Sequence, residues 1–528
     1  MPRIFSRPAI VAGLLLLPAL ASAAPPAAPS VNVGAGLKQL RFDFEPVTGA
    51  SSYQLWFRAN GGANWVKYMD STAATTVFKV TVSAHLLDWF NARYYVTACN
   101  SDGCSRTADI YVTSLMRDTV GYFKPRATAV EPWRYGQHPS LSADGTTLAV
   151  LGGETRGIRQ HSASVMVYRK GASGWVQEAR LEPTPVEEET AAPVYRKNLA
   201  INANGTVVVV GLPNYYLPAP GASQEGAFYI FRRGSSGWAL DKMNSLGEVR
   251  SWLYAKAIDV DDAGQTVAVW RPYIEGRDDG QQGAVEIWKY ASTAWNLQTI
   301  IPIPDGVSSC EGFSLSGNGR ILARVCSGRM QIFELQGGEF VLRQTIEGGG
   351  SPWAEVDTTS DGSLIVRATD PIAPEGASWR PYHTVYRRDA SGWQPDPAFT
   401  FVGGRAPKPP SNYYGGPIAI SADGRFVAVG SYSDENAGSG VVRGPLTRTS
   451  IYSGAVFVFE RKPTAWSLRN MIKPNVASNQ GAFGYGLSFG DNGKILAVGA
   501  MGEDSAARGI DGDQADTSAP DSGAAWLY

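Results

Sequence analysis

A short turn that ends in glycine and is flanked by apolar runs occurs seven times along the chain. "LSADGTTLAVLG", "ISADGRFVAVG" and "FGDNGKILAVG" are three of the copies. Asp-Gly and Asn-Gly supply the positive φ angles of tight hairpins, so each copy is expected to fold as strand, turn, strand. The turn glycines are Gly145, Gly205, Gly264, Gly319, Gly362, Gly424 and Gly493.

Each copy is followed by two further apolar segments. The third segment reads "GAFYIFRR" or "GAVFVFERK" in typical copies, and "SGW" or "TAW" marks the start of the fourth. Four antiparallel strands per repeat, with no helix between them, predict a seven-bladed β-propeller. A solenoid is the alternative, although solenoid repeats seldom consist of four strands.

The last copy ends on its third strand, "DSGAAWLY", at Asp521–Tyr528. Before the first copy lies "TVGYFKP" (Thr119–Pro125), which is similar to "LRNMIKP", the fourth strand of the sixth copy. We therefore predict that the two segments pair in one blade. This closure would remove the exposed sheet edges that an open array leaves.

The copies resemble FG-GAP repeats, the propeller units of integrin α-chain heads and of many exported bacterial proteins. "FGYGLSFGDNGKILAVGA" (Phe483–Ala500) carries the resemblance best, and Tyr135-Gly136 and Tyr414-Gly415 stand at the Phe-Gly position of two other copies. The resemblance covers residues 117–528 and implies a propeller fold. The calcium loop of that family carries several alternating aspartates, whereas turns such as "SADG" here offer too few oxygens to surround an ion.

The chain begins like an exported protein. A basic start, the apolar run "AIVAGLLLLPALA" and the small residues "ASA" predict a signal peptide over residues 1–23, with a membrane anchor as the alternative. A Pro/Ala linker at 24–30 follows. The mature protein is expected to be periplasmic, secreted or at the cell surface, with no transmembrane segment.

Residues 31–116 carry short alternating runs separated by turn signals, which predict a β-sandwich. "FEPVTGASSYQLWFR" and "YYVTACNSDGCS" resemble a fibronectin type III domain. The resemblance implies that Tyr94 is the corner tyrosine of that fold, with Phe44 where the family often has tryptophan. Such domains are usually spacers or adhesive modules, so the resemblance implies no chemistry.

The four cysteines predict two hairpin disulfides, Cys99–Cys104 and Cys310–Cys326, in an oxidising compartment. A three-residue loop at "GNG" would make residues whose numbers sum to 636 face each other, and Cys310 and Cys326 meet that condition. Buried free thiols are the alternative.

Charge and motifs exclude several functions. Lys+Arg (47) and Asp+Glu (48) nearly cancel, so no global charge attracts nucleic acid. The four histidines (His85, His138, His161 and His383) are scattered, and no H-E-x-x-H or G-x-S-x-G motif occurs. We predict no catalytic residues, no metal and no cofactor. The acidic segment "GEDSAARGIDGDQADTSAPDSG" is read as solvated, with a calcium site as the alternative.

The long insertions join strand two to three, or strand four to the next repeat, and such connections share one end of a propeller. Insertions on one face of a repeat protein often mark its binding surface, and Tyr, Trp and Arg dominate interface hot spots. The predicted ligand-binding residues of this loop face are Trp133, Tyr215, Tyr216, Trp252, Arg271, Tyr273, Trp353, Trp379 and Tyr413. The loop face also carries Tyr135, Tyr254, Tyr382 and Tyr414, and about half of all its aromatic residues are expected to pack between blades instead of binding a ligand.

The sequence therefore predicts an all-β, exported, two-domain protein: a fibronectin type III-like sandwich followed by a seven-bladed propeller closed by its N- and C-terminal strands. The leading hypothesis is a monomeric, non-enzymatic binding or adhesion protein that binds a protein or glycan at the loop face. A carbohydrate-active hydrolase or lyase, with carboxylates from several blades that converge at the loop face, is one alternative. An envelope scaffold is the other.

Overall fold

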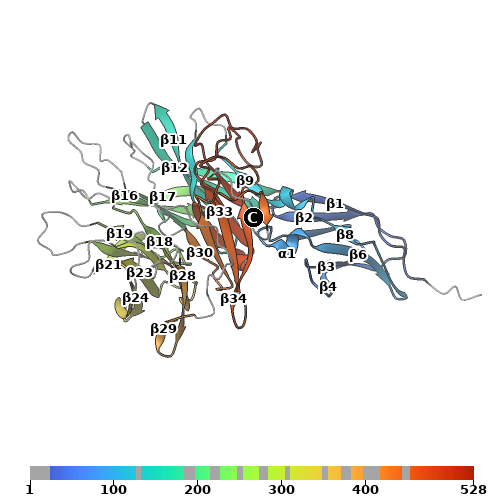
Figure 1. The fold of residues 1–528 in the computed structure, drawn as a ribbon, viewed down its shortest axis with the longest axis horizontal. Coiled ribbons are helices and arrows are strands. Elements are labelled where there is room, and N and C mark those ends of the chain that lie inside the picture. Colours follow the sequence, from blue (N-terminus) through green and yellow to red (C-terminus); the bar gives the residue numbers. More distant parts are fainter. Residues whose placement is uncertain are drawn as a thin grey trace, which may run out of the picture.

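The structure is a computed structural model of the chain (Figure 1). It describes residues 24–126, 132–157, 160–183, 197–213, 226–246, 254–272, 283–303, 310–347, 355–369, 382–396, 417–442 and 452–528. In this part of the chain the architecture is all-β, with strands in antiparallel sheets. No helix of the described residues is long and apolar enough to cross a membrane. The predicted signal peptide, residues 1–23, lies outside the described residues.

Two sheets at the N-terminal end pack face to face. The first is β1 (Val31–Gly36), β2 (Gln39–Phe44) and β5 (Val77–Thr81). The second is β4 (Val66–Thr72), β3 (Ser52–Arg58), β6 (Arg93–Asn100) and β7 (Gly103–Arg106), with β8 (Ile110–Tyr111) also paired to β6. The helix α1 (Leu87–Phe90) precedes β6. The core between the sheets includes Phe42 against Tyr94, with ring centroids 4.9 Å apart.

The expected role of Tyr94 as a corner tyrosine is not what the structure shows. Tyr94 is fully buried, but its hydroxyl has no hydrogen-bond partner among the described residues. The tyrosine that bonds to the backbone is Tyr53, whose hydroxyl accepts from the Val47 N–H at 2.7 Å. Both side chains point inward because alternate residues of β3 and β6 face the core, so the sequence pattern alone could not choose between them.

Outside the sandwich, the strands form further sheets that we number in chain order. Sheet 1 is β10 (Pro132–Leu141), β11 (Thr147–Gly157), β12 (Gln160–Gly171) and β13 (Gly174–Leu181). Sheet 2 is β14 (Leu199–Ile201), β15 (Val207–Leu212), β16 (Ala227–Gly234) and β17 (Gly237–Ser245). Sheet 3 is β18 (Ile258–Val260), β19 (Thr266–Arg271), β20 (Ala284–Ala291) and β21 (Ala294–Pro302). Sheet 4 is β22 (Cys310–Leu315), β23 (Ile321–Cys326), β24 (Arg329–Gln336) and β25 (Glu339–Ile346).

Sheet 5 is β26 (Val356–Thr358), β27 (Leu364–Thr369), β28 (Tyr382–Asp389) and β29 (Gly392–Pro395). Sheet 6 is β30 (Ile418–Ile420), β31 (Phe426–Ser431), β33 (Ala455–Arg461) and β34 (Trp466–Lys473), with β32 (Gly440–Val442) as an added edge strand. Sheet 7 is β35 (Gly486–Gly490), β36 (Ile495–Ala500), β37 (Ala524–Leu527) and β9 (Gly121–Phe123).

The first strands of these sheets contact one another in a closed circuit. β10 contacts β14, and the contacts continue through β18, β22, β26, β30 and β35 back to β10. A closed circle of four-stranded antiparallel sheets, each joined to the next by its inner strand, is a β-propeller. The inner strands surround a central channel.

The predicted hairpins form at each repeat, but their loops differ from the expectation. All of the turn glycines have positive φ, from 65° at Gly264 to 78° at Gly493. In sheet 4, Leu315 faces Leu322. The residue numbers of facing pairs near the turn therefore sum to 637 and not to 636, so the predicted three-residue loop was wrong. A register shift between Cys310 and Gly312 then brings Cys310 opposite Cys326, which confirms the disulfide. The Cys99–Cys104 disulfide is also confirmed.

The predicted pairing of the last strand with the segment before the first repeat is confirmed. Ala525 faces Phe123, Trp526 faces Tyr122 and Leu527 faces Gly121. The strand of that segment is shorter than expected, because residues Met116–Thr119 form a 3₁₀ helix. Sheet 7 thus contains three strands from the C-terminal end of the sequence and one from before sheet 1.

Sheets 6 and 7 share a second feature, a buried lysine at the end of the fourth strand. Lys124 Nζ lies 2.7 Å from Glu503 Oε2, and Lys473 Nζ lies 2.8 Å from Asp434 Oδ1. Both lysines precede a proline, and both acidic residues stand four positions after a glycine of strand two. In each sheet, the segment that follows the acidic residue then pairs with the outer edge of the fourth strand. Val441 faces Ile472 in sheet 6, and Ile510 faces Phe123 in sheet 7. This equivalence identifies β9 as the fourth strand of its sheet on grounds independent of register.

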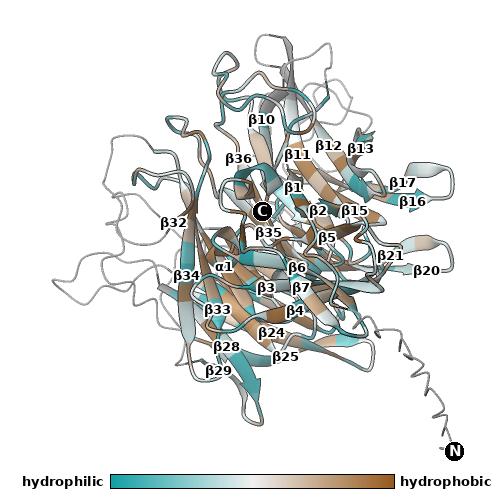
Figure 2. Cartoon of the chain, turned by 90° about the vertical axis from the view of Figure 1, so that its right-hand side faces the viewer, coloured by the Kyte–Doolittle hydropathy of each residue, from teal (hydrophilic) through white to brown (hydrophobic). Residues whose placement is uncertain are grey.

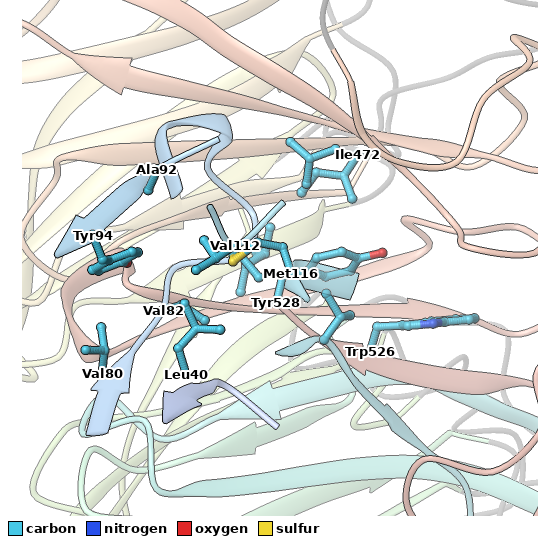
Figure 3. Packing of buried hydrophobic residues seen from close by; sticks show 14 of the residues in the cluster. Leu40, Val80, Val82, Ala92, Tyr94, Val112, Met116, Ile472, Trp526 and Tyr528 are labelled. Atoms are coloured by element: carbon cyan, nitrogen blue, oxygen red, sulfur yellow. The ribbon is translucent and has the colours of Figure 1, made fainter. Parts of the chain in front are cut away.

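The sandwich and the propeller share one hydrophobic core (Figure 3). Val82 and Met116 of the sandwich side pack with Ile472, Trp526 and Tyr528 of sheets 6 and 7. In Figure 2 the sandwich lies in front of the ring, and Figure 1 shows the C-terminus between the two. Polar contacts add to this interface, since Asn470 Nδ2 donates to the His85 carbonyl at 2.7 Å and Arg469 pairs with Asp88.

The "SGW" and "TAW" tryptophans join neighbouring sheets. Trp238 of sheet 2 donates its indole N–H to Glu178 of sheet 1 at 2.9 Å, and Trp295 of sheet 3 donates in the same way to Asp241 of sheet 2. Glu178 Oε1 also accepts a hydrogen bond from Arg233 Nη2 of sheet 2 at 2.6 Å. Both carboxylates stand at a β-bulge of the fourth strand, which turns the side chain toward the next sheet.

Glu178 gives a prediction about acid stability. Burial alone would raise its pKa, but Arg233, Trp238 and Arg169 together lower the pKa to about 2. The stabilisation is therefore present above the ordinary glutamate pKa and is lost as the pH falls toward 2. We expect Glu178→Gln to lower the free energy of unfolding by about 1–2 kcal/mol at pH 7, and to flatten its pH dependence below about pH 4.5. Denaturant titrations at several pH values measure both effects.

Glu182→Gln is the matched control, because Glu182 pairs with Arg180 but its side chain is 49% exposed. This control is expected to change stability by less than about 0.5 kcal/mol. Equal pH profiles for Glu178→Gln and the wild type would contradict the role given to Glu178.

Candidate functional site

The central channel holds a cavity of about 200 Å³ that is lined by the inner strands of all the sheets. The residue five positions before each turn glycine lies on this lining. Several of these residues carry a short polar side chain: Ser140, Asp259, Ser314, Asp357 and Ser488. The channel is therefore a place where carboxylates from different sheets, Asp259 and Asp357, come together.

These side chains satisfy the open edges of the inner strands. An inner strand has a neighbour on one side only, so some of its backbone N–H groups have no partner within the sheet. Asp259 Oδ2 accepts the Leu315 N–H at 2.9 Å, Asp357 Oδ2 accepts the Ile420 N–H at 3.0 Å, and Ser488 Oγ accepts the Leu141 N–H at 2.9 Å. In each case the acceptor belongs to the preceding sheet. The polar lining thus has a structural task.

Lys197 crosses the channel from sheet 2 to sheet 5. Its Nζ donates to Asp357 Oδ1 and to the Val356 carbonyl, each at 3.0 Å, and lies 3.9 Å from Asp259 Oδ2. Ser314 Oγ lies between the two carboxylates, 3.1 Å from Asp259 and 3.2 Å from Asp357. Asp259, Ser314, Asp357 and Lys197 form one network, which we call the channel cluster.

The two carboxylates of the channel cluster share one positive charge, that of Lys197. Burial raises the pKa of Asp259, although Lys197 and the Leu315 N–H oppose this shift. Burial would lower the pKa of Lys197, but Asp357 and Asp259 raise it above its ordinary value. Lys197 stays charged and holds both carboxylates. Both carboxylates therefore serve as hydrogen-bond acceptors within the network.

The turns of neighbouring sheets are joined at the other end of the channel by backbone hydrogen bonds. The donor and acceptor pairs are Asp491–Ala143, Asp144–Ala203, Ala203–Asp262, Asp262–Gly317, Asn318–Ser360 and Ser360–Ala422, at 2.7–3.2 Å. Ser360 also donates to Asp262 across sheet 4. Between sheets 6 and 7 the imidazole of His85 packs against Phe426 and Phe489, with centroids 6.2 and 6.1 Å away. The sandwich thus covers part of this end, and Phe489 itself lines the cavity.

Most of the predicted loop-face residues cannot be placed. Tyr215, Tyr216, Trp252, Tyr273, Trp353, Trp379 and Tyr413 lie outside the described residues. Trp133 belongs to β10, where it faces Gly153, and its side chain lies outside what the structure describes. Arg271 is described: its side chain is 12% exposed and its Nη1 lies 3.1 Å from Glu286 Oε1.

Two of the loop-face aromatic residues, Tyr135 and Tyr254, are buried between sheets. Tyr135 donates to the Tyr168 hydroxyl at 2.9 Å, and Tyr254 donates to Glu286 Oε2 at 2.8 Å. The residues that the sequence reading missed are Lys197, Asp259 and Asp357. The signal for the two aspartates was the position five residues before the turn glycine, where Asp occurs in two repeats and Ser or Ala in the others, whereas Lys197 had no such signal.

The acidic segment 502–522 is organised by protein groups. Asp511 Oδ1 accepts the Tyr122 N–H at 2.9 Å, and Asp504 Oδ1 accepts the Asp521 N–H at 3.1 Å. Within it, Lys124 Nζ contacts Glu503 and donates to Ser522 Oγ at 2.6 Å. No group of three or more Asp, Glu, His or Cys that could hold a metal ion occurs among the described residues.

Comparisons with known proteins give remote likenesses only. No protein-family model and no curated protein matches the sequence. A periplasmic gluconolactonase from Pseudomonas aeruginosa is similar in structure, with 16% identity and a TM-score of 0.40 over 81% of this chain and 97% of that one. The β-propeller domain of Cps50 (Swd1) from Myceliophteria thermophila shares 10% identity, with a TM-score of 0.45 over 77% of this chain and 99% of that one. Likenesses this distant carry no argument about activity.

Proposed function

We propose that this protein is an exported, non-enzymatic binding protein that holds a protein or glycan ligand at the loop face of its propeller. The long connections leave from one end of the ring, since they join β15 to β16, β19 to β20, β27 to β28 and β31 to β33. The connections from β17 to β18 and from β29 to β30 leave from the same end. Their sequences are rich in Tyr, Trp and Arg, which suits a binding surface.

The observation that carries the choice of binding over catalysis is the state of the channel carboxylates. Asp259 and Asp357 are bonded to Lys197, to Ser314 and to backbone N–H groups of the next sheet. A hydrolase needs one carboxyl group with free access to the substrate and a second that acts as base or nucleophile. Carboxylates that hold the ring together favour a binding role.

We also infer the finer architecture. Sheets 1 to 7 are the blades of a seven-bladed FG-GAP-like propeller over residues 117–528. The sandwich at 31–116 is a fibronectin type III-like domain, residues 1–23 are a signal peptide and 24–30 are a linker. Two disulfides suit an oxidising, exported compartment. The chain is proposed to act as a monomer.

The proposal is tested by screening the mature chain against a glycan array and against purified envelope proteins. The variant Trp252→Ala/Trp353→Ala/Trp379→Ala is expected to lose at least about tenfold in affinity for the ligand that is found, since such anchors often contribute more than 1 kcal/mol each. Leu240→Ala/Leu297→Ala/Leu342→Ala is the matched control on the outer strands, where these side chains are 42–46% exposed. Unchanged affinity in the tryptophan variant would refute the loop-face site.

A carbohydrate-active enzyme is the second candidate. It is supported by Asp259 and Asp357, which come from different sheets and lie within hydrogen-bond distance of the same Ser314 hydroxyl. In this case a ligand that enters the channel would displace Lys197 from the carboxylates. The two functions differ in whether the ligand is recovered intact.

A further inference from the structure

The solvent face of the second sandwich sheet carries a group of stacked tryptophan, tyrosine and arginine side chains. Alternate residues of β3 and β6 face the core, which leaves Trp56 and Arg58 on the outer face of β3, and Arg93 and Tyr95 on that of β6. We call the outer set the aromatic–arginine face. Its members are Trp56, Arg58, Trp65, Arg93, Tyr95 and Arg106.

The rings and guanidinium groups of this face pack on one another. The Trp56 and Tyr95 rings are stacked, 5.7 Å apart and 15° from parallel, and Trp65 meets Tyr95 edge-on at 4.5 Å. The Arg58 guanidinium lies 4.7 Å from the Trp65 ring, and that of Arg106 lies 4.5 Å from Tyr95. These contacts hold the guanidinium groups of Arg58 and Arg106 in place. Such preorganisation lowers the entropy cost of binding.

The positive charge of this face is only partly neutralised. Asp109 is the carboxylate that pairs with it in the described part of the chain, and its oxygens lie 3.0 Å from Arg106 and 3.7 Å from both Arg58 and Arg93. Each guanidinium has five N–H donors, so one carboxylate does not occupy all of them, and Arg58 is the least exposed of the three at 24%. Arg93 and Arg106 are 41% and 49% exposed. Three guanidiniums against one carboxylate make this a cationic face on a chain that is almost neutral overall.

We propose that the aromatic–arginine face binds an acidic polysaccharide, a chain of sugars that carries carboxylate or sulfate groups. Forked guanidinium donors match the two oxygens of a carboxylate, and strands about 4.8 Å apart repeat these donors across the sheet. The neighbouring Tyr111 ring is 60% exposed and suits the apolar face of a sugar. Guanidinium groups repeated across a sheet surface suit a linear polyanion better than a folded protein, whose interfaces depend on buried anchors.

This inference goes beyond the proposed function, because the surface belongs to the sandwich and not to the propeller. The Cys99–Cys104 disulfide links β6 to β7, the strands that carry Tyr95 and Arg106. It keeps the hairpin in register and so preserves the stacking. A sequence reading could have found the surface from the period-two pattern of Trp56–Arg58 and Arg93–Tyr95, which the β-sandwich assignment already implied.

The test is direct binding of the whole mature chain to polygalacturonate, measured by biolayer interferometry at several salt concentrations. Wild-type protein is expected to bind, with affinity that falls as salt rises. Arg93→Ala/Arg106→Ala is expected to lose at least about tenfold in affinity and to show a shallower salt dependence. Arg106→Lys keeps the charge but loses the forked, stacked geometry, and is expected to lose severalfold.

Arg41→Ala is the matched control. Arg41 lies on β2, in the other sheet, and pairs with Asp43 at 2.7 Å. It removes the same charge from the same domain and is expected to change affinity by less than about twofold. Circular dichroism and melting curves check that each variant folds. The proposal is overturned if wild type does not bind, if Arg41→Ala loses as much as the double variant, or if polyglutamate or duplex DNA binds equally well.

Discussion

Deletion of Thr119–Pro125 is expected to abolish cooperative folding of the propeller. The deletion removes β9, whose residues Gly121–Phe123 are fully paired with β37, and it removes the buried Tyr122 and Lys124. Sheet 7 would then keep an open edge at the point where the chain closes. We expect the free energy of unfolding to fall by more than about 5 kcal/mol, which approaches the whole stability of a typical domain.

Hydrogen exchange followed by mass spectrometry is the measurement for this deletion. Protection is expected to be lost in residues 486–500 and 524–527 first, because sheet 7 loses its fourth strand. A length-matched deletion of residues 443–449, within a connection of sheet 6, is the control and is expected to cost far less. Retention of wild-type protection in β37 after removal of Thr119–Pro125 would show that β9 does not close the ring.

The second large effect is expected for Lys124. Lys124→Met leaves Glu503 buried, at 5% exposure, without the charge that compensates it. Burial lowers the pKa of Lys124 and raises that of Glu503, so the pair exists only because each partner opposes the desolvation of the other. Removal of one partner from such a pair costs about 3–5 kcal/mol.

A double-mutant cycle separates the pair from general damage. Lys124→Met/Glu503→Leu is expected to regain most of the loss, since no uncompensated charge remains. Lys473→Met should behave like Lys124→Met, because Lys473 pairs with the buried Asp434 in sheet 6. Lys494→Met, in an exposed pair with Asp491, is the control and should change stability by less than about 0.5 kcal/mol. A cost below about 1 kcal/mol for Lys124→Met would contradict the assigned role.

The features predicted correctly depend on local sequence. Each Asp-Gly or Asn-Gly turn forms a hairpin, because glycine alone adopts the required φ without strain. The pairing of "DSGAAWLY" with "TVGYFKP" was also predictable, since a seventh repeat with three strands lacks a fourth. The Cys310–Cys326 bond was correct although the loop length was wrong, because the register shift next to Cys310 compensates for it.

The channel cluster was not predicted, because its members are distant in sequence and belong to different sheets. Lys197 and Asp357 are brought together only when the ring closes, and nothing local marks a lysine that crosses the channel. The Lys124–Glu503 pair, by contrast, could have been predicted from the sequence. The fourth strands of sheets 7 and 6 end in "FKP" and "IKP", and each sheet has an acidic residue four positions after the glycine of its second strand. The lysine of each segment pairs with the acidic residue of the same sheet. The alternation of residues in β3 and β6 predicts that both Tyr53 and Tyr94 point inward. It does not predict which hydroxyl reaches a backbone N–H, and in the structure this is Tyr53.

The central claim is that the propeller binds its ligand and leaves it unchanged. The most direct measurement incubates the ligand found in the screen with wild type and with Asp259→Asn/Asp357→Asn, and records bound ligand and its covalent integrity by mass spectrometry. We predict that both proteins return intact ligand and that the folded fraction of the double variant binds with wild-type affinity. Cleavage of the ligand by wild type that the Asp259→Asn/Asp357→Asn variant fails to catalyse would contradict it.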